Sequence, residues 1–361
     1  MSNPFRGRPS AGFWSSGVSG QLPGRFDPVG EVGFRLSATD KVATLGSCFA
    51  QHLARSIQAA GYHYLVQEHA PSGADPEQVA SYGVFSARYG NIYTVRQAVQ
   101  LLDRAFDGRI FQDTVWQRGG RWHDAFRPTV EPRGFASLEV LLADREQHLD
   151  AVRQVFLEAD VIVFTLGLTE GWVSQLDGAT YPVAPGVAAG AYDSSRHAFV
   201  NFDYGQVRAD LTSWIGRVRE INSNVRILLT VSPVPLAATF EDRNVWASTT
   251  YSKATLLAVA YDVARTHKNV DYFPSYEIVT NPLVQGRYYA DDLRSVTDGG
   301  VAHVMRIFQD HYFGDGEVTA AGFIDEPEPI QADIRQLDEV VAVICDDDLL
   351  DAPDLRRTPG D

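Results

Sequence analysis

The sequence predicts a three-layer α/β fold: a doubly wound, mostly parallel sheet of about five strands with helices on both of its faces. Three observations support this prediction. Short runs of apolar and β-branched residues recur along the chain, which is typical of strands buried on both faces. Segments with helical spacing of apolar residues lie between these runs. Because strands and helices alternate, the sheet is expected to be parallel, with a ligand crevice at the carboxyl ends of its strands.

The expected elements follow one another in a regular order. Strands are predicted over residues 42–45, 161–166, 226–231 and 270–273. Helical spacing of apolar side chains predicts helices over residues 49–60, 138–159, 206–221, 249–266 and 299–308. Ser47, Gly167 and Ser232 each follow the end of a strand, so these residues are expected together at one edge of the sheet.

Three regions of the chain differ in composition. Residues 1–39 are rich in Gly, Ser and Pro and contain scattered aromatic residues, which predicts an irregular arm laid across the domain. Residues 40–313 form the predicted α/β domain. Within it, residues 171–201 carry turn signals typical of an inserted hairpin or loop that shapes a substrate pocket. Residues 314–361 form an acidic tail with one short amphipathic helix, which is expected to dock on the domain or on a partner protein.

Charge and composition exclude several functional classes. The chain has 361 residues, 45% of them apolar, which is typical of a globular protein. Its net charge of −15 comes mostly from residues 314–361, which contain fourteen acidic residues and three arginines. Since basic and aromatic residues do not cluster, we expect no nucleic-acid partner. No apolar stretch reaches the ~20 residues of a membrane span, so none is expected.

The two cysteines, Cys48 and Cys345, are far apart and show no metal-ligand spacing. This pattern predicts neither a disulfide framework nor a zinc site, and it favours a reducing, cytoplasmic location. The first residues of the chain lack the apolar segment of a signal peptide, which agrees with that location. No glycine-rich phosphate-binding loop is present, so we expect no cofactor and no bound metal.

The best lead to chemistry is the tripeptide Gly46-Ser47-Cys48, which joins the first predicted strand to the first predicted helix. Unpaired backbone N–H groups and the helix dipole at such a junction favour developing negative charge, so a nucleophile there lies beside an oxyanion site. The alternative is that Ser47 caps the helix. Cys48 is either a small buried residue or a thiol nucleophile. We rank Ser47 first, because neighbouring side chains in such a turn point in different directions.

Several blocks of the sequence resemble one known family. Residues 46–50 read Gly-Ser-Cys-Phe-Ala, and similar blocks follow in the same order at residues 89–94, 165–172, 230–236 and 272–277. Over roughly residues 40–313 the chain resembles the GSCFA family, which is related to the SGNH (GDSL-like) esterases and acyltransferases. The resemblance implies an SGNH or flavodoxin-like sheet and ester chemistry through a serine.

The resemblance also implies a nucleophile and oxyanion donors. Ser47 matches the SGNH nucleophile, and its backbone N–H would also serve the oxyanion. Gly90 matches the glycine donor of the second block, and the Asn91 amide lies beside it in the sequence.

The third block of the related esterases reads Gly-x-Asn. Gly167 matches its glycine, but Thr169 stands in place of the asparagine, and Glu170 follows directly. The Thr169 hydroxyl retains one hydrogen-bond donor for the oxyanion.

The fourth block departs most from the related esterases, where it reads Asp-x-x-His. Asp292 matches the aspartate, but Ser295 stands in place of the histidine. A serine nucleophile needs a base that accepts its proton. His303 and His197 are the two candidate replacements, His52 is the third, and the remaining alternative is that no histidine serves. Asp292 would orient the base or replace it.

For two further motifs, a structural role is expected rather than a catalytic or binding role. Lys253 opens a helical segment after Tyr-Ser, where a surface lysine is expected rather than the partner of a serine. Asp124 and Arg127 are expected to form an ion pair rather than to bind a polar substrate.

The leading hypothesis is therefore an SGNH-like enzyme that hydrolyses an O-acyl ester or transfers an acyl group to a glycan or another polar metabolite through Ser47. The rival hypothesis is a binding or scaffold protein that keeps the fold without catalysis, because the expected histidine is missing. A third hypothesis gives the acidic tail a protein partner.

Overall fold

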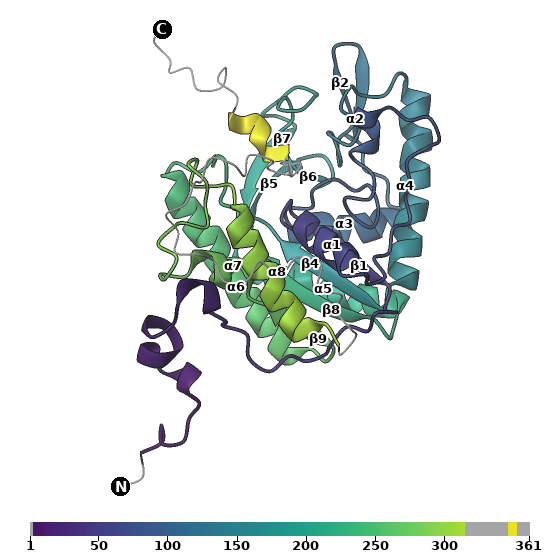
Figure 1. Ribbon diagram of the computed structural model, residues 1–361. Coiled ribbons are helices and arrows are strands. Elements are labelled where there is room, and N and C mark those ends of the chain that lie inside the picture. Colours follow the sequence, from purple (N-terminus) through teal and green to yellow (C-terminus); the bar gives the residue numbers. More distant parts are fainter. Residues whose placement is uncertain (1–2, 315–345, 352–361) are drawn as a thin grey trace.

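A parallel four-stranded sheet forms the centre of the protein (Figure 1). The computed structural model describes residues 3–314 and 346–351. Neighbouring strands follow the order β1, β4, β8, β9, and every pair is parallel. The predicted α/β class is confirmed, and the strands lie where the sequence predicted them: β1 (Val42–Gly46), β4 (Val161–Leu166), β8 (Arg226–Val231) and β9 (Val270–Phe273).

The edge of the sheet beside β1 is shorter than expected. A single parallel bridge joins Val42 to Tyr64, held by hydrogen bonds from the Val42 N–H to the His63 carbonyl (2.9 Å) and from the Leu65 N–H to the Val42 carbonyl (2.9 Å). After Leu65 the chain turns away from β1. The sheet therefore has four strands where the sequence suggested about five.

Helices cover both faces of the sheet and give the three layers. The α1, α7 and α8 helices pack on one face, and α3, α4, α5 and α6 pack on the other. The helices are α1 (Ala50–Ala59), α2 (Pro76–Val79), α3 (Val95–Phe106), α4 (Leu138–Glu158), α5 (Tyr204–Ile221), α6 (Val245–Thr266), α7 (Ser275–Thr280) and α8 (Asp298–Tyr312).

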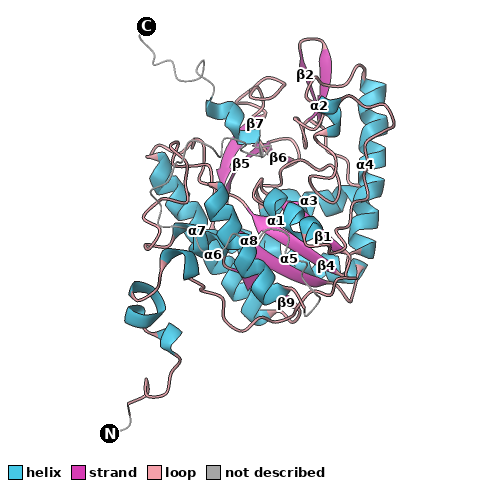
Figure 2. Cartoon of the chain, viewed as in Figure 1, coloured by secondary structure: helices cyan, strands magenta, loops and turns pink. Residues whose placement is uncertain are grey.

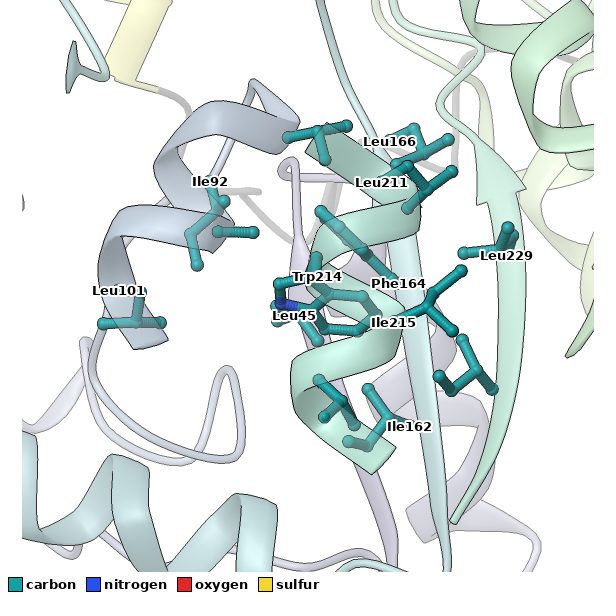
Figure 3. Close-up of a cluster of buried hydrophobic side chains, with 14 of the residues drawn as sticks. Leu45, Ile92, Leu101, Ile162, Phe164, Leu166, Leu211, Trp214, Ile215 and Leu229 are labelled. Atoms are coloured by element: carbon teal, nitrogen blue, oxygen red, sulfur yellow. The ribbon is translucent and has the colours of Figure 1, made fainter. Parts of the chain in front are cut away.

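The β4 strand shows how the two faces share the core. Val161 and Val163 face α1 and α8, whereas Ile162 and Phe164 face the opposite layer. There Phe164 packs against the fully buried Trp214 of α5, with ring centroids 4.9 Å apart (Figure 3). Because both faces are covered, these strands read as continuous apolar runs rather than as alternating patterns.

Two small antiparallel sheets lie outside the central sheet (Figure 2). One is a hairpin of β2 (Val115–Arg118) and β3 (Arg121–Asp124). The other has the order β6-β5-β7 and is built from the segment that follows β4: β5 (Glu170–Ser174), β6 (Thr180–Tyr181) and β7 (His197–Asn201). Since β5 begins shortly after β4 ends, this sheet stands at the carboxyl edge of the central sheet.

The amino-terminal arm has two parts. Residues 3–22 form short helical turns that project away from the domain, and the Gly24 carbonyl accepts from Arg306 of α8 (2.6 Å) (Figure 1). Residues 26–36 return to it, and there the Gly33 N–H donates to the Asp271 carboxylate (2.7 Å). At the other end, the short helix η5 (Asp346–Asp351) returns to the domain, whereas the predicted tail helix near residues 334–344 lies outside the described residues. No helix in the described part of the chain is long and apolar enough to cross a membrane.

Candidate active site

A sharp turn at the end of β1 presents Ser47 at the edge of the sheet. Gly46 has a φ of +126°, and a Cβ atom there would lie 2.2 Å from the Thr165 carbonyl oxygen of β4. Only glycine fits such a close backbone approach at positive φ. The Ser47 N–H then donates to the same Thr165 oxygen (3.0 Å). This N–H is therefore hydrogen-bonded to β4, which contradicts its expected role as a donor to the oxyanion.

The Ser47 side chain does not cap α1. The helix begins at Ala50, and its N-cap position is Phe49, which makes no side-chain capping bond. The Ser47 hydroxyl oxygen is buried and has no hydrogen-bond partner among the described residues. The prediction that Ser47 caps the helix is therefore wrong.

Ser47 lines a small pocket of about 10 Å³. Loops that follow β1, β4 and β8 form part of its wall, as the sequence predicted for this edge of the sheet. Cys48 also contributes to the wall, so the two adjacent residues share one cavity. The other lining residues are Tyr93, Gly167, Leu168, Ser232, Val234, Pro235 and Lys253.

Lys253 is the residue of this cavity that sequence reasoning missed. The expected surface lysine is wrong, because its side chain is 1% exposed and its Nζ donates to the Gly167 carbonyl (2.8 Å). A signal was present in the sequence, since helical spacing places Lys253 on the same face of α6 as the buried Leu256 and Ala260. A lysine on an apolar face is held there by a specific partner.

Gly167 keeps Lys253 and Ser47 close together. A Cβ atom at Gly167 would lie 3.1 Å from the Ser47 Cβ, and the carbonyl of the same residue accepts from Lys253. The Gly167 N–H donates to the Tyr93 carbonyl (3.2 Å), and Tyr93 also lines the cavity.

The predicted donors Gly90 and Asn91 lie in a neighbouring, larger cavity of about 440 Å³. The Ile92 N–H donates to the Gly46 carbonyl (2.8 Å), so this loop is fixed against the turn that carries Ser47. The Asn91 side-chain amide donates to the carboxylate of Asp346 (3.1 Å).

Thr169 and Glu170 have other partners and do not line the Ser47 cavity. The Thr169 hydroxyl donates to the Asn201 side chain (2.7 Å). Glu170 accepts from the Thr239 hydroxyl (2.8 Å), and burial raises the pKa of its carboxyl. The structure therefore brings Gly167 to Ser47 but directs the Thr169 side chain toward β7 and the Glu170 side chain toward the loop between β8 and α6.

His197 is the first residue of β7 in the small β6-β5-β7 sheet. Its Nε2 lies 2.8 Å from an Asp113 carboxylate oxygen, and its Nδ1 accepts the N–H of Asp193 (3.1 Å). Both ring nitrogens are thus engaged away from the Ser47 cavity, which contradicts the expectation that His197 reaches Ser47.

His303 and His52 are also absent from the wall of the Ser47 cavity. His303 is buried in α8, where its Nδ1 lies 2.7 Å from the Tyr288 hydroxyl, and burial lowers its pKa to about 4. His52 lies beside Phe49 with ring centroids 5.3 Å apart, and burial lowers its pKa to about 4. Among the described residues, no histidine lines the cavity of Ser47.

Asp292 closes a turn around the missing histidine position. Its carboxylate accepts the N–H groups of Arg294 and Ser295 (both 2.9 Å) and the Ser295 hydroxyl (2.6 Å). Burial alone would raise its pKa, but these hydrogen bonds and the Arg294 charge hold the pKa below its ordinary value. The exposed Asp292 side chain is therefore fixed within its own loop.

A buried network of charges supports the wall of the larger cavity. Asp124 is fully buried and pairs with Arg127 (3.1 Å) and Arg145 (3.0 Å). Burial would raise the pKa of Asp124, but Arg145, Arg127 and Arg104 together hold it well below its ordinary value. This network is the expected structural ion pair. The described residues contain no cluster of His, Cys, Asp and Glu that could hold a metal ion.

This geometry defines the class of protein. It is a three-layer α/β domain with a buried serine at its first strand–helix turn, and the hydroxyl of that serine has no hydrogen-bond partner among the described residues. The chain belongs to the GSCFA family, whose profile matches residues 41–308.

Three solved structures resemble the chain at low sequence identity. A putative GDSL-like lipase from Parabacteroides merdae is 13% identical with a TM-score of 0.32, covering 78% of this chain and 98% of its own. A mutant acetyl-xylooligosaccharide esterase from Geobacillus Stearmophilus is 12% identical with a TM-score of 0.31, covering 77% and 96%. A family 3 carbohydrate esterase from Clostridium thermocellum is 14% identical with a TM-score of 0.25, covering 75% and 94%. A comparison with curated protein sequences found no match.

Proposed function

We propose that the protein is an ester-active enzyme, an O-acyl esterase or O-acyltransferase that acts on a glycan or another polar metabolite through an acyl-enzyme at Ser47. One observation carries this proposal. The Ser47 hydroxyl has no hydrogen-bond partner among the described residues, and the buried residues Ser47 and Lys253 line the same small pocket.

Lys253 takes the place of the missing histidine as the base. A buried site disfavours the charged form of a lysine, and a neutral amine accepts a proton. As the Ser47 oxygen attacks the acyl carbon of the ester, its proton passes to the Lys253 Nζ. When the bond to the leaving alkoxide breaks, the same proton goes to that oxygen. Serine and lysine form such pairs on unrelated folds.

The acyl-enzyme then reacts with a second hydroxyl. Water releases the acid, whereas a sugar hydroxyl gives a transferred ester. In both cases Lys253 accepts the proton of the attacking hydroxyl and returns it to the Ser47 oxygen as the acyl bond breaks. The family resemblance supports the Asn91 amide as a donor to the oxyanion, since the Ile92 N–H bond to the Gly46 carbonyl (2.8 Å) fixes this loop against the turn that carries Ser47.

Active-site labelling tests the proposal directly. The purified chain is treated with a fluorophosphonate, and the modified residue is found by mass spectrometry in wild type, Ser47→Ala, Cys48→Ala and Lys253→Met. We expect labelling at Ser47, none in Ser47→Ala, and little change in Cys48→Ala. Loss of a general base slows such reactions by about 10²–10⁴-fold, so Lys253→Met should label at least about 100 times more slowly.

The pH dependence of labelling separates a chemical from a structural role of Lys253. If the amine is the base, the wild-type rate rises with pH as the amine loses its proton, and this rise disappears in Lys253→Met. A Lys253→Met variant that keeps both the wild-type rate and its pH profile would remove Lys253 from the mechanism.

The rival function is a binding protein without catalysis. It is favoured by one observation, the absence of a histidine from the described wall of the Ser47 cavity. If neither the wild-type chain nor an Asp346→Ala variant is labelled at Ser47, this rival is the better conclusion.

A further inference from the structure

The carboxyl-terminal helix η5 places a carboxylate inside the domain. Asp346 is 1% exposed. Its carboxylate accepts from the Asn91 amide (3.1 Å) and from the Thr129 hydroxyl, and its backbone N–H donates to the Tyr93 hydroxyl (3.0 Å). The Asn91 amide is also the group that the proposed mechanism gives to the oxyanion.

The two cavities at this edge of the sheet differ greatly in size. The cavity at Ser47, of about 10 Å³, has room for no more than about one water molecule. The neighbouring cavity of about 440 Å³ lies within the range of sites for small ligands. The Ser47 hydroxyl oxygen is itself buried, so an ester has no room beside it in this conformation.

The η5 segment contacts the walls of both cavities. Tyr93 lines the smaller cavity and accepts from the Asp346 N–H, whereas Asn91 and Thr129 line the larger cavity and hold the Asp346 carboxylate. Leu349, one turn further along η5, lines the larger cavity directly. The segment thus lies against residues of both cavities.

We propose that residues 346–351 are an internal inhibitor that occupies a substrate subsite. Asn91 and Thr129 form a site for a pair of oxygens on one carbon, as in a carboxylate or an ester acyl group, and Asp346 fills it. Leu349 occupies part of the adjoining cavity, whose wall is mostly apolar: Ala80, Val84, Phe85, Pro128, Val130, Pro132 and Ala188. The subsite therefore takes an oxygen pair that carries an apolar substituent.

Substrate access follows from this arrangement. When the segment leaves, the Asn91 amide becomes available to the reacting carbonyl, and the two cavities join. The consequence for catalysis rests on the proposed function, but the docking of Asp346 does not.

Hydrogen exchange in the full-length chain tests the docking without any catalysis. Exchange is followed by mass spectrometry in peptides that cover residues 88–94 and 127–133, in wild type, Asp346→Ala and Leu349→Asp. Asp310→Ala serves as the control, because that carboxylate is 58% exposed on α8. We expect exchange in both peptides to be at least about fivefold faster in the two η5 variants and unchanged in the control.

A free carboxylate then tests the subsite itself. Sodium propionate at millimolar concentration should restore slow exchange in Asp346→Ala, where the subsite is empty, and should have no effect on wild type. In the fluorophosphonate assay, Asp346→Ala should label Ser47 about tenfold faster than wild type, since the open state is no longer a minor population.

The outcomes separate the two proposals. Faster exchange with propionate protection, but no labelling at Ser47 in any variant, would support the subsite and reject the proposed function. Unchanged exchange in both Asp346→Ala and Leu349→Asp would overturn the inhibitor proposal, whether or not Ser47 is labelled.

Discussion

The turn at Gly46 allows one substitution whose effect can be worked from the structure. In Gly46→Ala, the new Cβ would lie 2.2 Å from the Thr165 carbonyl oxygen and 2.8 Å from both the carbonyl carbon and the amide nitrogen of Thr165. All three atoms are backbone atoms of the adjacent strand. The overlap therefore cannot be relieved by a side-chain rotation, and β1 has to move away from β4.

Two costs add to one another in this variant. Holding a residue other than glycine at a φ of +126° costs about 1–3 kcal/mol. Separating the strands weakens the Ser47 N–H bond to Thr165 and its neighbour in the ladder, at about 1 kcal/mol each. The sum is about 3–5 kcal/mol. With an unfolding entropy of about 2.1 cal/mol/K per residue over about 300 residues, the Tm should fall by about 5–8 °C.

A matched control makes this measurement decisive. Gly216 lies on the exposed face of α5 with no atom near its would-be Cβ, so Gly216→Ala should stabilise the chain by about 0.5–1 kcal/mol. Thermal unfolding by circular dichroism should thus give opposite signs for the same chemical change. If Gly46→Ala unfolds at or above the wild-type temperature, the argument from the strand contact is incorrect.

Two further predictions concern the buried charges beside the larger cavity. Asp124→Asn removes the charge that compensates Arg127 and should cost about 3–5 kcal/mol in urea unfolding at pH 7, whereas Asp150→Asn, at an exposed carboxylate, should change stability by less than about 0.5 kcal/mol. Burial would raise the pKa of Glu68, but His148, with contributions from Arg127, lowers it to about 2. The folded state then binds fewer protons than the unfolded state. The contribution of Glu68 to the free energy of unfolding is therefore complete above about pH 5 and is lost as the pH falls toward about 2. Glu68→Gln should therefore flatten the acid side of the stability profile, and an unchanged acid midpoint and slope would contradict this.

The fold could be predicted from the sequence because its signal is local. Strands buried on both faces, such as β4, are continuous apolar runs, and the helices between them have a regular apolar spacing. The number of strands was harder to predict, because it depends on how far residues 63–65 continue to pair with β1. After Tyr64 the pairing ends within one residue, and no local pattern marks that point.

The site could be predicted only in part, because its partners come from distant segments. Ser47 was found from its strand–helix turn. Lys253 was predicted to be exposed because it was placed at the opening of a helical segment, whereas α6 begins at Val245 and Lys253 lies on its buried face. The base was sought among histidines, and the structure directs His197 to Asp113 instead. The contact between Asp346 and Asn91 spans 255 positions and leaves no mark in either segment.

The order of the central sheet has a consequence for how the protein folds. The cavity of Ser47 takes its wall from residues 47–48, 93, 167–168, 232, 234–235 and 253, which come from separate parts of the chain. Parallel pairing of β1 with β4 closes a loop of more than a hundred residues before either strand is stabilised. Such non-local contacts form slowly and late. A compact intermediate that has its helices but not this strand pair has no cavity at Ser47, so recovery of the site after denaturation should follow the slowest folding phase.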